Sequence, residues 1–349
     1  MLFRQLYDAT SSTYTYLLAD EQSGEAVYID TVFEQIQRDL ALLDELGLTL
    51  KYVLDTHCHA DHVTGAWLMK QKTGCQIVSA EAINASSVDW AVKEGDVIHF
   101  GRHTLTVMAT PGHTDGCVTY VTEGQRKAFT GDTVLIRGCG RSDFQQGNAA
   151  TLFHSITDKI FKLPEDCAIY PAHDYNGRTR SSVAEEKQFN ARAGGGASEN
   201  DFVGYMNAMR LPHPKKLDIA LPANLRSGEP EDGEFPKAPD WADIRITFSG
   251  VPEVDPEWVH QHQPEVTLLD VREEDEVLDE EQRIEPSKII PLSQLRDRVE
   301  EVPKDKPVVC LCRSGRRSSL AVSILKEAGY EKVANIRGGL LLWRERGLN

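Results

Sequence analysis

The short segment from Thr56 to His62 constrains this chain more than any other part of the sequence. It reads Thr-His-Cys-His-Ala-Asp-His and follows directly on the apolar run 52–54. Imidazoles and carboxylates are common metal ligands, and this spacing brings several of them to one end of a strand. The segment therefore predicts a metal site at a strand end, with candidate ligands His57, His59, Asp61 and His62.

Three later loops add single candidate ligands to this site. His113, Asp132 and His173 each follow a strand-like stretch. Any one of these residues could be an ordinary hydrogen-bonded loop residue. His and Asp residues recur at the ends of several strands, and this pattern indicates that their side chains come together to bind a metal.

Size and charge limit the class of protein. A chain of 349 residues is too long for one small core and predicts two domains. The net charge of -16 argues against a nucleic-acid or anionic membrane surface. We expect a soluble, cytoplasmic protein, because the N-terminus lacks the apolar core of a signal peptide and no stretch approaches the roughly 18 to 20 apolar residues that span a bilayer. Seven scattered cysteines fit a reducing compartment.

The sequence predicts two α/β domains, residues 1–225 and 242–349, joined by a linker over residues 226–241. The linker is rich in Pro, Gly and acidic residues and has no apolar period. In the first domain, two strand-like runs within 13–30 precede a helical period over 33–46, and short strands lead into the ligand loops. In the second domain, β-rich runs alternate with helical segments, as expected of a parallel sheet.

The whole ligand pattern resembles the metallo-β-lactamase superfamily over residues 1–225. The resemblance implies an αββα sandwich, in which two sheets pack face to face with helices on both outer surfaces. In hydrolases of this superfamily, such as glyoxalase II, these positions hold two metal ions that generate a hydroxide nucleophile. All the ligand types are present here, so the ligand set alone leaves both a dinuclear hydrolase and a mononuclear enzyme open.

The sequence after Asp132 is more discriminating, because residues 134–147 resemble the persulfide dioxygenase family. Residues 173–177 and 211–218 also resemble it, and the long helical substrate domain of glyoxalase II is missing. In that family a single iron(II) per chain is held by residues that match His57, His113 and Asp132. Two imidazoles and one carboxylate leave coordination positions open for a thiol-derived sulfur and dioxygen.

The same resemblance implies supporting roles for further residues. His59, Asp61, His62 and His173 would surround the iron ligands and hydrogen-bond to them. Arg141 and Tyr175 would help to bind the anionic glutathione moiety, although a surface ion pair is the alternative for Arg141. The sequence gives no reason why a second metal would be kept out.

A second reactive centre is predicted at Cys312, which follows the apolar strand 307–311 and precedes a helical segment that starts at Ser318. A helix N-terminus stabilises a thiolate, and nearby arginines add positive potential. The loop and its surroundings resemble the rhodanese family over residues 242–349. The resemblance implies catalytic roles for Cys312, Arg313 and Arg317, with the sulfur donor bound by Ser314, Gly315 and Arg316. A small phosphatase is the alternative, but its Cys-x5-Arg loop is one residue longer.

Together these patterns predict a bifunctional enzyme of sulfur metabolism. The iron site would oxidise glutathione persulfide with dioxygen to sulfite and glutathione, and Cys312 would carry sulfur between thiosulfate and glutathione. The sequence leaves open a homo-oligomer. It also leaves open a dinuclear thioester hydrolase that acts on glutathione thioesters, and a non-catalytic sulfur carrier or sensor.

Overall fold

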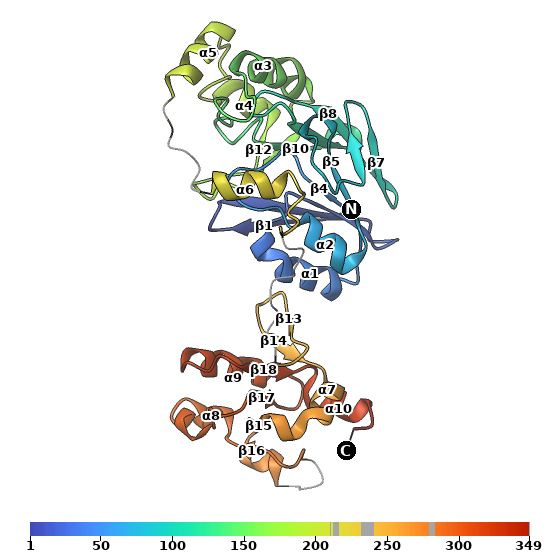
Figure 1. The fold of residues 1–349 in the computed structure, drawn as a ribbon, viewed down its shortest axis with the longest axis vertical. Helices are drawn as coiled ribbons and strands as arrows, with labels where there is room; N and C mark the ends of the chain where they lie inside the picture. Colours follow the sequence, from blue (N-terminus) through green and yellow to red (C-terminus); the bar gives the residue numbers. More distant parts are fainter. Residues whose placement is uncertain (210, 212–215, 232–240, 279–282, 349) are drawn as a thin grey trace. The chain divides into compact units, whose positions relative to one another are not determined.

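The computed structural model describes residues 1–209, 211, 216–231, 241–278 and 283–348 (Figure 1). The chain divides into two compact units, Met1–Ile36 with Leu46–Phe235, and Gln37–Glu45 with Pro236–Asn349. Most of the linker expected over 226–241 lies outside the described residues, so its bounds stay a prediction. Within the described ranges, no helix is long and apolar enough to cross a membrane.

In the part of the chain that the structure describes, the first unit contains two six-stranded sheets, ordered β1-β2-β3-β4-β5-β6 and β12-β11-β10-β9-β8-β7. The strands of the first sheet are β1 (Leu2–Asp8), β2 (Thr13–Ala19), β3 (Glu25–Ile29), β4 (Thr49–Leu54), β5 (Gln76–Ala80) and β6 (Trp90–Val92). Those of the second sheet are β7 (Val97–Phe100), β8 (His103–Ala109), β9 (Val118–Thr122), β10 (Lys127–Gly131), β11 (Ala168–Pro171) and β12 (Ser181–Ser182).

Local signals in the sequence explain where several helices begin and end. The α-helices up to the linker are α1 (Ile36–Glu45), α2 (Ala66–Thr73), α3 (Ala149–His154), α4 (Val183–Phe189), α5 (Glu199–Ala208) and α6 (Leu217–Asn224). The side chains of Asn148 and Ser182 accept hydrogen bonds from backbone N–H groups at the starts of α3 and α4. Ser198 and Asp201 form a capping box at α5, and Gly74 ends α2 in the left-handed conformation.

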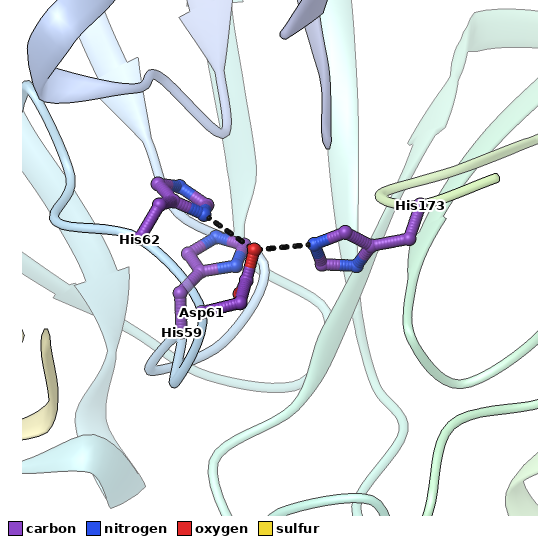
Figure 2. A group of neighbouring side chains, drawn as sticks. All are labelled: His59, Asp61, His62 and His173. Carbon is purple, nitrogen blue, oxygen red and sulfur yellow. Dashed lines mark hydrogen bonds and ion pairs between the residues drawn. The ribbon is translucent and has the colours of Figure 1, made fainter. Parts of the chain in front are cut away.

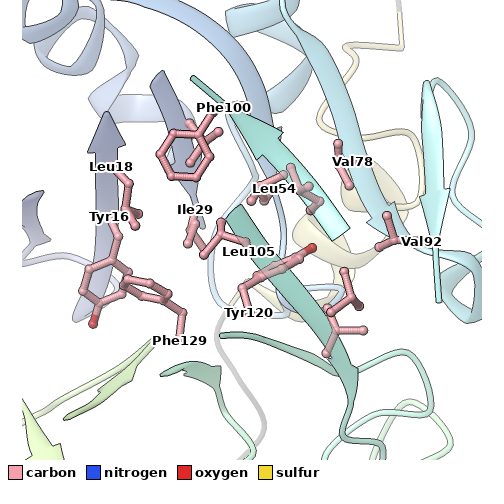
Figure 3. Close-up of a cluster of buried hydrophobic side chains, with 14 of the residues drawn as sticks. Tyr16, Leu18, Ile29, Leu54, Val78, Val92, Phe100, Leu105, Tyr120 and Phe129 are labelled. Carbon is pink, nitrogen blue, oxygen red and sulfur yellow. The ribbon is translucent and has the colours of Figure 1, made fainter. Parts of the chain in front are cut away.

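The core of the first unit lies between the two sheets. Figure 3 shows Tyr16, Leu54 and Ile29 of one sheet facing Phe129 and Tyr120 of the other. All these side chains are almost completely buried, as expected for the facing surfaces of a sandwich. The predicted αββα sandwich is therefore confirmed.

Strand direction explains why the ligand loops meet. β8 and β10 both run antiparallel to β9, which lies between them, so they point the same way. β11 is parallel to β10. The carboxyl ends of these strands therefore lie at one edge of the sheet, and each leads into a loop that carries a candidate ligand.

The second unit is a mostly parallel sheet with the order β13-β14-β18-β17-β15-β16, in which only the edge strand β13 is antiparallel to its described neighbour. Its strands are β13 (Arg245–Ile246), β14 (Pro252–Val254), β15 (Thr267–Asp270), β16 (Lys288–Ile289), β17 (Val308–Leu311) and β18 (Val333–Ile336). Its helices are α7 (Pro256–His262), α8 (Leu292–Leu295), α9 (Arg316–Glu327) and α10 (Gly339–Glu345). Apolar clusters on both faces of the sheet bury Val308 and Cys310 on one side and Val309 and Leu311 on the other. The predicted parallel α/β fold is confirmed.

The helix after Cys312 starts earlier than the sequence pattern predicted. We expected it to begin at Ser318, but α9 begins at Arg316. Gly315 adopts the left-handed conformation, with φ of 88°, and turns the chain directly into the helix. Arg316 and Arg317 therefore belong to the first helical turn and not to the loop.

Candidate metal centre and sulfur-transfer loop

His57, His113 and Asp132, called the triad below, come together at the edge of the sandwich. They follow β4, β8 and β10. One ligand atom from each lies within 4.8 Å of the others. Their roles as metal ligands were predicted from sequence resemblance, and the structure brings these three residues into one group.

Hydrogen bonds fix which nitrogen of His57 faces the triad. The Thr56 hydroxyl donates to the Asp30 carboxylate, 3.0 Å from Oδ1 and 2.9 Å from Oδ2. Its oxygen is left to accept a hydrogen bond from His57 Nδ1, 3.0 Å away. With the proton on Nδ1, the lone pair of Nε2 is available to a metal. Burial, together with the neighbouring His59, lowers the pKa of His57 well below its usual value, so the ring is neutral.

His113 and Asp132 are oriented in the same manner. His113 Nδ1 donates to the backbone carbonyl of Arg141 at 2.6 Å, and its Nε2 lies 3.6 Å from Asp132 Oδ2. Asp132 Oδ1 accepts a hydrogen bond from His173 Nδ1 at 2.7 Å. Burial opposes ionisation of Asp132, but the charge of His173 outweighs it, and the pKa of Asp132 lies well below its usual value. Each triad side chain is thus hydrogen-bonded to the protein through one polar atom and offers another atom as a metal ligand.

Replacing Thr56 with valine should weaken metal binding without removing a ligand. The variant keeps the side-chain shape but loses the hydroxyl that orients His57, and loss of such a partner typically weakens affinity by roughly 10- to 100-fold. Competition with a chelator, on metal-free protein titrated with metal, measures the change. Thr157→Val is the control, because the Thr157 hydroxyl donates to the Phe153 carbonyl, away from the triad. Unchanged affinity in Thr56→Val would contradict the orienting role.

His59, Asp61, His62 and His173 form a second group beside the triad (Figure 2). His62 Nδ1 and His173 Nε2 approach Asp61 Oδ2 from opposite sides, each at 3.0 Å. Burial lowers the pKa of His173, but contacts with Asp132 and Asp61 outweigh it and raise that pKa well above its usual value. Of the four residues, His173 alone hydrogen-bonds the triad within the described ranges. The other hydrogen bonds that the structure shows for the side chains of the group go to Asp30, Thr13 and one another.

Two nitrogens of this group have no hydrogen-bond partner among the described residues. They are His59 Nδ1 and His62 Nε2, and both rings are almost completely buried. Buried polar atoms are normally paired, because an unpaired one loses its hydration without compensation. Imidazole and carboxylate donors suit a divalent transition metal. The residues at this edge of the sandwich therefore fit a metal site.

Two glycines let the chain pass close to the triad. A Cβ at Gly140 would lie 2.7 Å from His113 Nδ1 and 2.7 Å from the Asp132 carbonyl oxygen. A Cβ at Gly131, where φ is +52°, would lie 2.6 Å from Thr56 Oγ1. A side chain at either position would push against a ligand or its hydrogen-bond partner.

A cavity of about 480 Å³ opens next to the ligand loops. Its lining includes Cys58 and Thr114, which neighbour two triad residues in sequence, and Phe144. Arg141 and Tyr175, predicted to bind glutathione, are not part of this lining. The Arg141 side chain pairs with Asp143, Nε to Oδ1 at 2.6 Å, and lies 4.1 Å from the Phe144 ring centroid.

Tyr175 lies two residues after His173 in the sequence. Its ring stacks on His173, with centroids 6.2 Å apart and planes at 5°. The residue is 69% exposed. The substrate-binding roles of Arg141 and Tyr175 stay predictions.

In the second unit, Cys312 follows β17 and lies at the start of α9. Its Sγ accepts hydrogen bonds from the Ser318 backbone N–H at 3.4 Å and hydroxyl at 3.2 Å. Burial opposes thiolate formation, but hydrogen bonds from Ser318 and from the backbone N–H groups of Ser314 and Gly315 lower the pKa of Cys312. Ser318 was not identified from the sequence. By contrast, burial raises the pKa of Cys310, which lies in the core.

Replacing Ser318 with alanine should raise the pKa of Cys312. The variant loses one donor to the thiolate, and a hydrogen bond to a charged group contributes about 1.5 kcal/mol, which corresponds to roughly one pKa unit. The pH dependence of Cys312 alkylation, followed by mass spectrometry, measures the shift. Ser319→Ala is the matched control, because the Ser319 hydroxyl donates to the Gly315 carbonyl at 2.7 Å. An equal shift in both variants would contradict a direct role for the Ser318 hydroxyl.

The arginines around Cys312 differ in their partners. Arg313 and Arg316 are exposed and make no ion pair with any described residue. Arg317 is partly buried and binds both carboxylate oxygens of Glu276. The structure places the five other residues predicted for this site within the loop or the first turn of α9. They are Arg313, Ser314, Gly315, Arg316 and Arg317.

Comparison with known proteins gives a family for each part. The family model described as the metallo-beta-lactamase superfamily matches residues 9–173, and the model for a rhodanese-like domain matches residues 255–346. A Bos taurus protein named persulfide dioxygenase ETHE1, mitochondrial, is 52% identical over 229 residues, which are 65% of this chain and 89% of that protein. A Brucella ovis hydroxyacylglutathione hydrolase is 38% identical over 218 residues, 62% of this chain and 83% of that protein.

A solved structure supports the same assignment. The crystal structure of ETHE1 from Myxococcus xanthus has a TM-score of 0.63 and 46% sequence identity, and covers 65% of this chain and 100% of that one. Identity to the proteins named ETHE1 exceeds identity to the hydrolase, as the sequence after Asp132 predicted. The chain therefore belongs to the persulfide dioxygenase family of the metallo-β-lactamase superfamily and carries a rhodanese-like domain after it.

Proposed function

We propose that the first unit oxidises glutathione persulfide with dioxygen and that the second transfers sulfur between thiosulfate and glutathione. Membership of the persulfide dioxygenase family supports the first reaction, and the rhodanese-like domain supports the second. In the first reaction, glutathione persulfide, dioxygen and water give glutathione, sulfite and protons. Dioxygen is the oxidant, and both of its atoms end in sulfite, whose remaining oxygen comes from water.

The proposed cofactor is a single iron(II) per chain, held by His57, His113 and Asp132. An iron(II) ion supplies the redox-active centre at which dioxygen can react with a persulfide sulfur. The protein orients the ligands, since Thr56, the Arg141 carbonyl and His173 each bind the second polar atom of a triad side chain. The cavity beside Cys58 and Thr114 gives small molecules access to the ligand loops.

One observation supports a single metal more than any other. His173 donates through both ring nitrogens, to Asp132 Oδ1 at 2.7 Å and to Asp61 Oδ2 at 3.0 Å. In a single-metal centre, His173 would keep both contacts and would orient Asp132 without being a ligand itself.

Metal analysis combined with oxygen uptake tests this proposal. Freshly purified protein is analysed for metal and then mixed with glutathione persulfide in air-saturated buffer, with a no-substrate control. A single iron per chain and substrate-dependent oxygen uptake are expected. Two metal ions per chain and no uptake would contradict the dioxygenase.

The second candidate for this unit is a dinuclear hydrolase of glutathione thioesters. The unpaired nitrogens His59 Nδ1 and His62 Nε2 favour it, because they could bind a second ion. The similarity to a hydroxyacylglutathione hydrolase also favours it. Release of glutathione from a thioester, without oxygen uptake, would identify this activity.

The second unit would transfer sulfur through a persulfide on Cys312. The thiolate attacks the outer sulfur of thiosulfate, a bond forms between that sulfur and Sγ, and sulfite leaves with the electron pair of the broken sulfur–sulfur bond. A glutathione thiolate then attacks the outer sulfur of the Cys312 persulfide. This step gives glutathione persulfide and restores the Cys312 thiolate. The exposed Arg313 and Arg316 would attract the anionic donor.

A further inference from the structure

One arginine beside a hydrogen-bond donor of Cys312 is held by an acidic residue from another part of the chain. Arg317 directly precedes Ser318 in α9, and the Cys312 thiolate favours its charged form. Its Nη2 donates to Glu276 Oε1 at 2.7 Å, and its Nη1 donates to Glu276 Oε2. Two parallel hydrogen bonds of this kind fix the plane of a guanidinium group as well as its position.

Glu276 is itself held in place. It lies in the 3-10 helix η7 (Glu274–Val277), and its Oε2 accepts a hydrogen bond from the Glu273 backbone N–H at 3.2 Å. Arg272 donates to the Glu276 backbone carbonyl at 3.2 Å. Arg272 in turn binds Asp270 through Nη2 and Oδ2 at 2.6 Å, and both of these side chains are buried. A rigid chain of contacts therefore runs from the end of β15 to Arg317.

The pair also changes the charge that a sulfur donor meets. Arg317 lowers the pKa of Glu276 to about 2, so Glu276 is ionised at neutral pH and offsets the charge of Arg317. Glu276 occupies the Nη1/Nη2 edge of the Arg317 guanidinium, so an oxyanion could reach Arg317 only through its remaining N–H groups, such as Nε–H. Among the described residues of the loop and first turn, the uncompensated positive charges are those of Arg313 and Arg316.

We propose that Glu276 is a positioning residue for sulfur transfer at Cys312, which aims the Arg317 guanidinium at the thiol loop and limits how strongly the loop binds doubly charged donors. This inference rests on the sulfurtransferase activity proposed above.

Steady-state transfer of sulfur from thiosulfate to glutathione tests both parts. Glu276→Ala should lower KM for thiosulfate by roughly 3- to 10-fold, because a nearby negative charge is lost, and lower kcat by roughly 10-fold, because Arg317 is no longer aimed. Glu276→Gln keeps an acceptor oxygen, so it should recover most of kcat while KM stays low. A purely structural defect would lower kcat without lowering KM, and that result would overturn the proposal.

A double variant shows whether Glu276 acts through Arg317. The kcat of Glu276→Ala with Arg317→Ala should equal that of Arg317→Ala within about 2-fold, since coupled residues are not additive. A further loss as large as that of Glu276→Ala alone would overturn the inference. Glu274→Gln is the control, because Glu274 lies in the same turn and contacts Gln294, and it should behave as wild type.

Alkylation of Cys312 by iodoacetamide gives a readout that needs no sulfur transfer. At a fixed pH below the pKa of the thiol, Glu276→Gln should react roughly 2- to 5-fold faster, because removing a negative charge favours the thiolate. An unchanged rate would overturn the role of Glu276. Absence of sulfur transfer in the wild-type protein would instead contradict the proposed function. The alkylation rate would still test whether Glu276 acts on the Cys312 thiol.

Discussion

Replacing His57 with alanine is expected to abolish oxygen uptake in the presence of glutathione persulfide, with a loss of roughly 1000-fold or more. A bound metal contributes several kcal/mol to such a reaction, and each 1.36 kcal/mol is about tenfold in rate. The variant removes one ligand and leaves the Thr56 oxygen without its donor. Oxygen-electrode rates and iron content, measured on the same preparation, test this expectation.

Two controls separate loss of the metal centre from general damage. His154→Ala removes an exposed histidine that pairs with Asp158 and should keep full iron content and full activity. Sulfur transfer by the His57→Ala protein should also persist, because Cys312 lies in the other unit. Normal oxygen uptake in His57→Ala would contradict the proposed triad.

Replacing Cys312 with serine is expected to abolish sulfur transfer from thiosulfate to glutathione, again by roughly 1000-fold or more, because a hydroxyl does not ionise near neutral pH and is a poor sulfur nucleophile. Oxygen uptake on added glutathione persulfide should stay within about 2-fold of wild type, because that reaction does not need the thiol. Sulfite release from thiosulfate and oxygen uptake, measured side by side, give both numbers.

Cys310→Ala is the matched control for this experiment. Cys310 lies two residues earlier in the same strand, but it is completely buried and its thiol has a raised pKa. Its replacement should cost about 1 kcal/mol of unfolding free energy and leave sulfur transfer intact. If sulfur transfer survives in Cys312→Ser and is lost in Cys310→Ala, the nucleophile is Cys310.

The sequence predicted the strands that precede the ligand loops, because those strands are short runs bounded by turn residues. Among the strands that it did not predict are β1 (Leu2–Asp8) and β6 (Trp90–Val92). β1 has no clear alternation of buried and exposed residues, and its extended state depends on pairing with β2 along its whole length. Strand pairing of this kind is a tertiary interaction that local pattern does not encode.

The reactive residues were visible in the sequence, but most of their partners were not. His and Asp at strand ends form a local pattern, whereas Thr13 reaches His173 only through the register of the two sheets. Glu276 and Arg317 are likewise far apart in sequence, and the fold brings η7 and α9 together. Asp30 is an exception, since it directly follows a predicted strand and the same criterion would have included it. The start of α9 was missed because the conformation of Gly315 determines it.

The way the triad is oriented has a thermodynamic consequence for how the protein acquires its cofactor. Each ligand side chain is already fixed through its other polar atom by Thr56, the Arg141 carbonyl or His173. The conformational entropy of ordering these side chains is therefore lost when the sandwich folds, and little more is lost when the ion arrives. Binding to the folded state alone also adds to its stability by mass action. Cofactor affinity and resistance to unfolding are thus linked quantities in this protein.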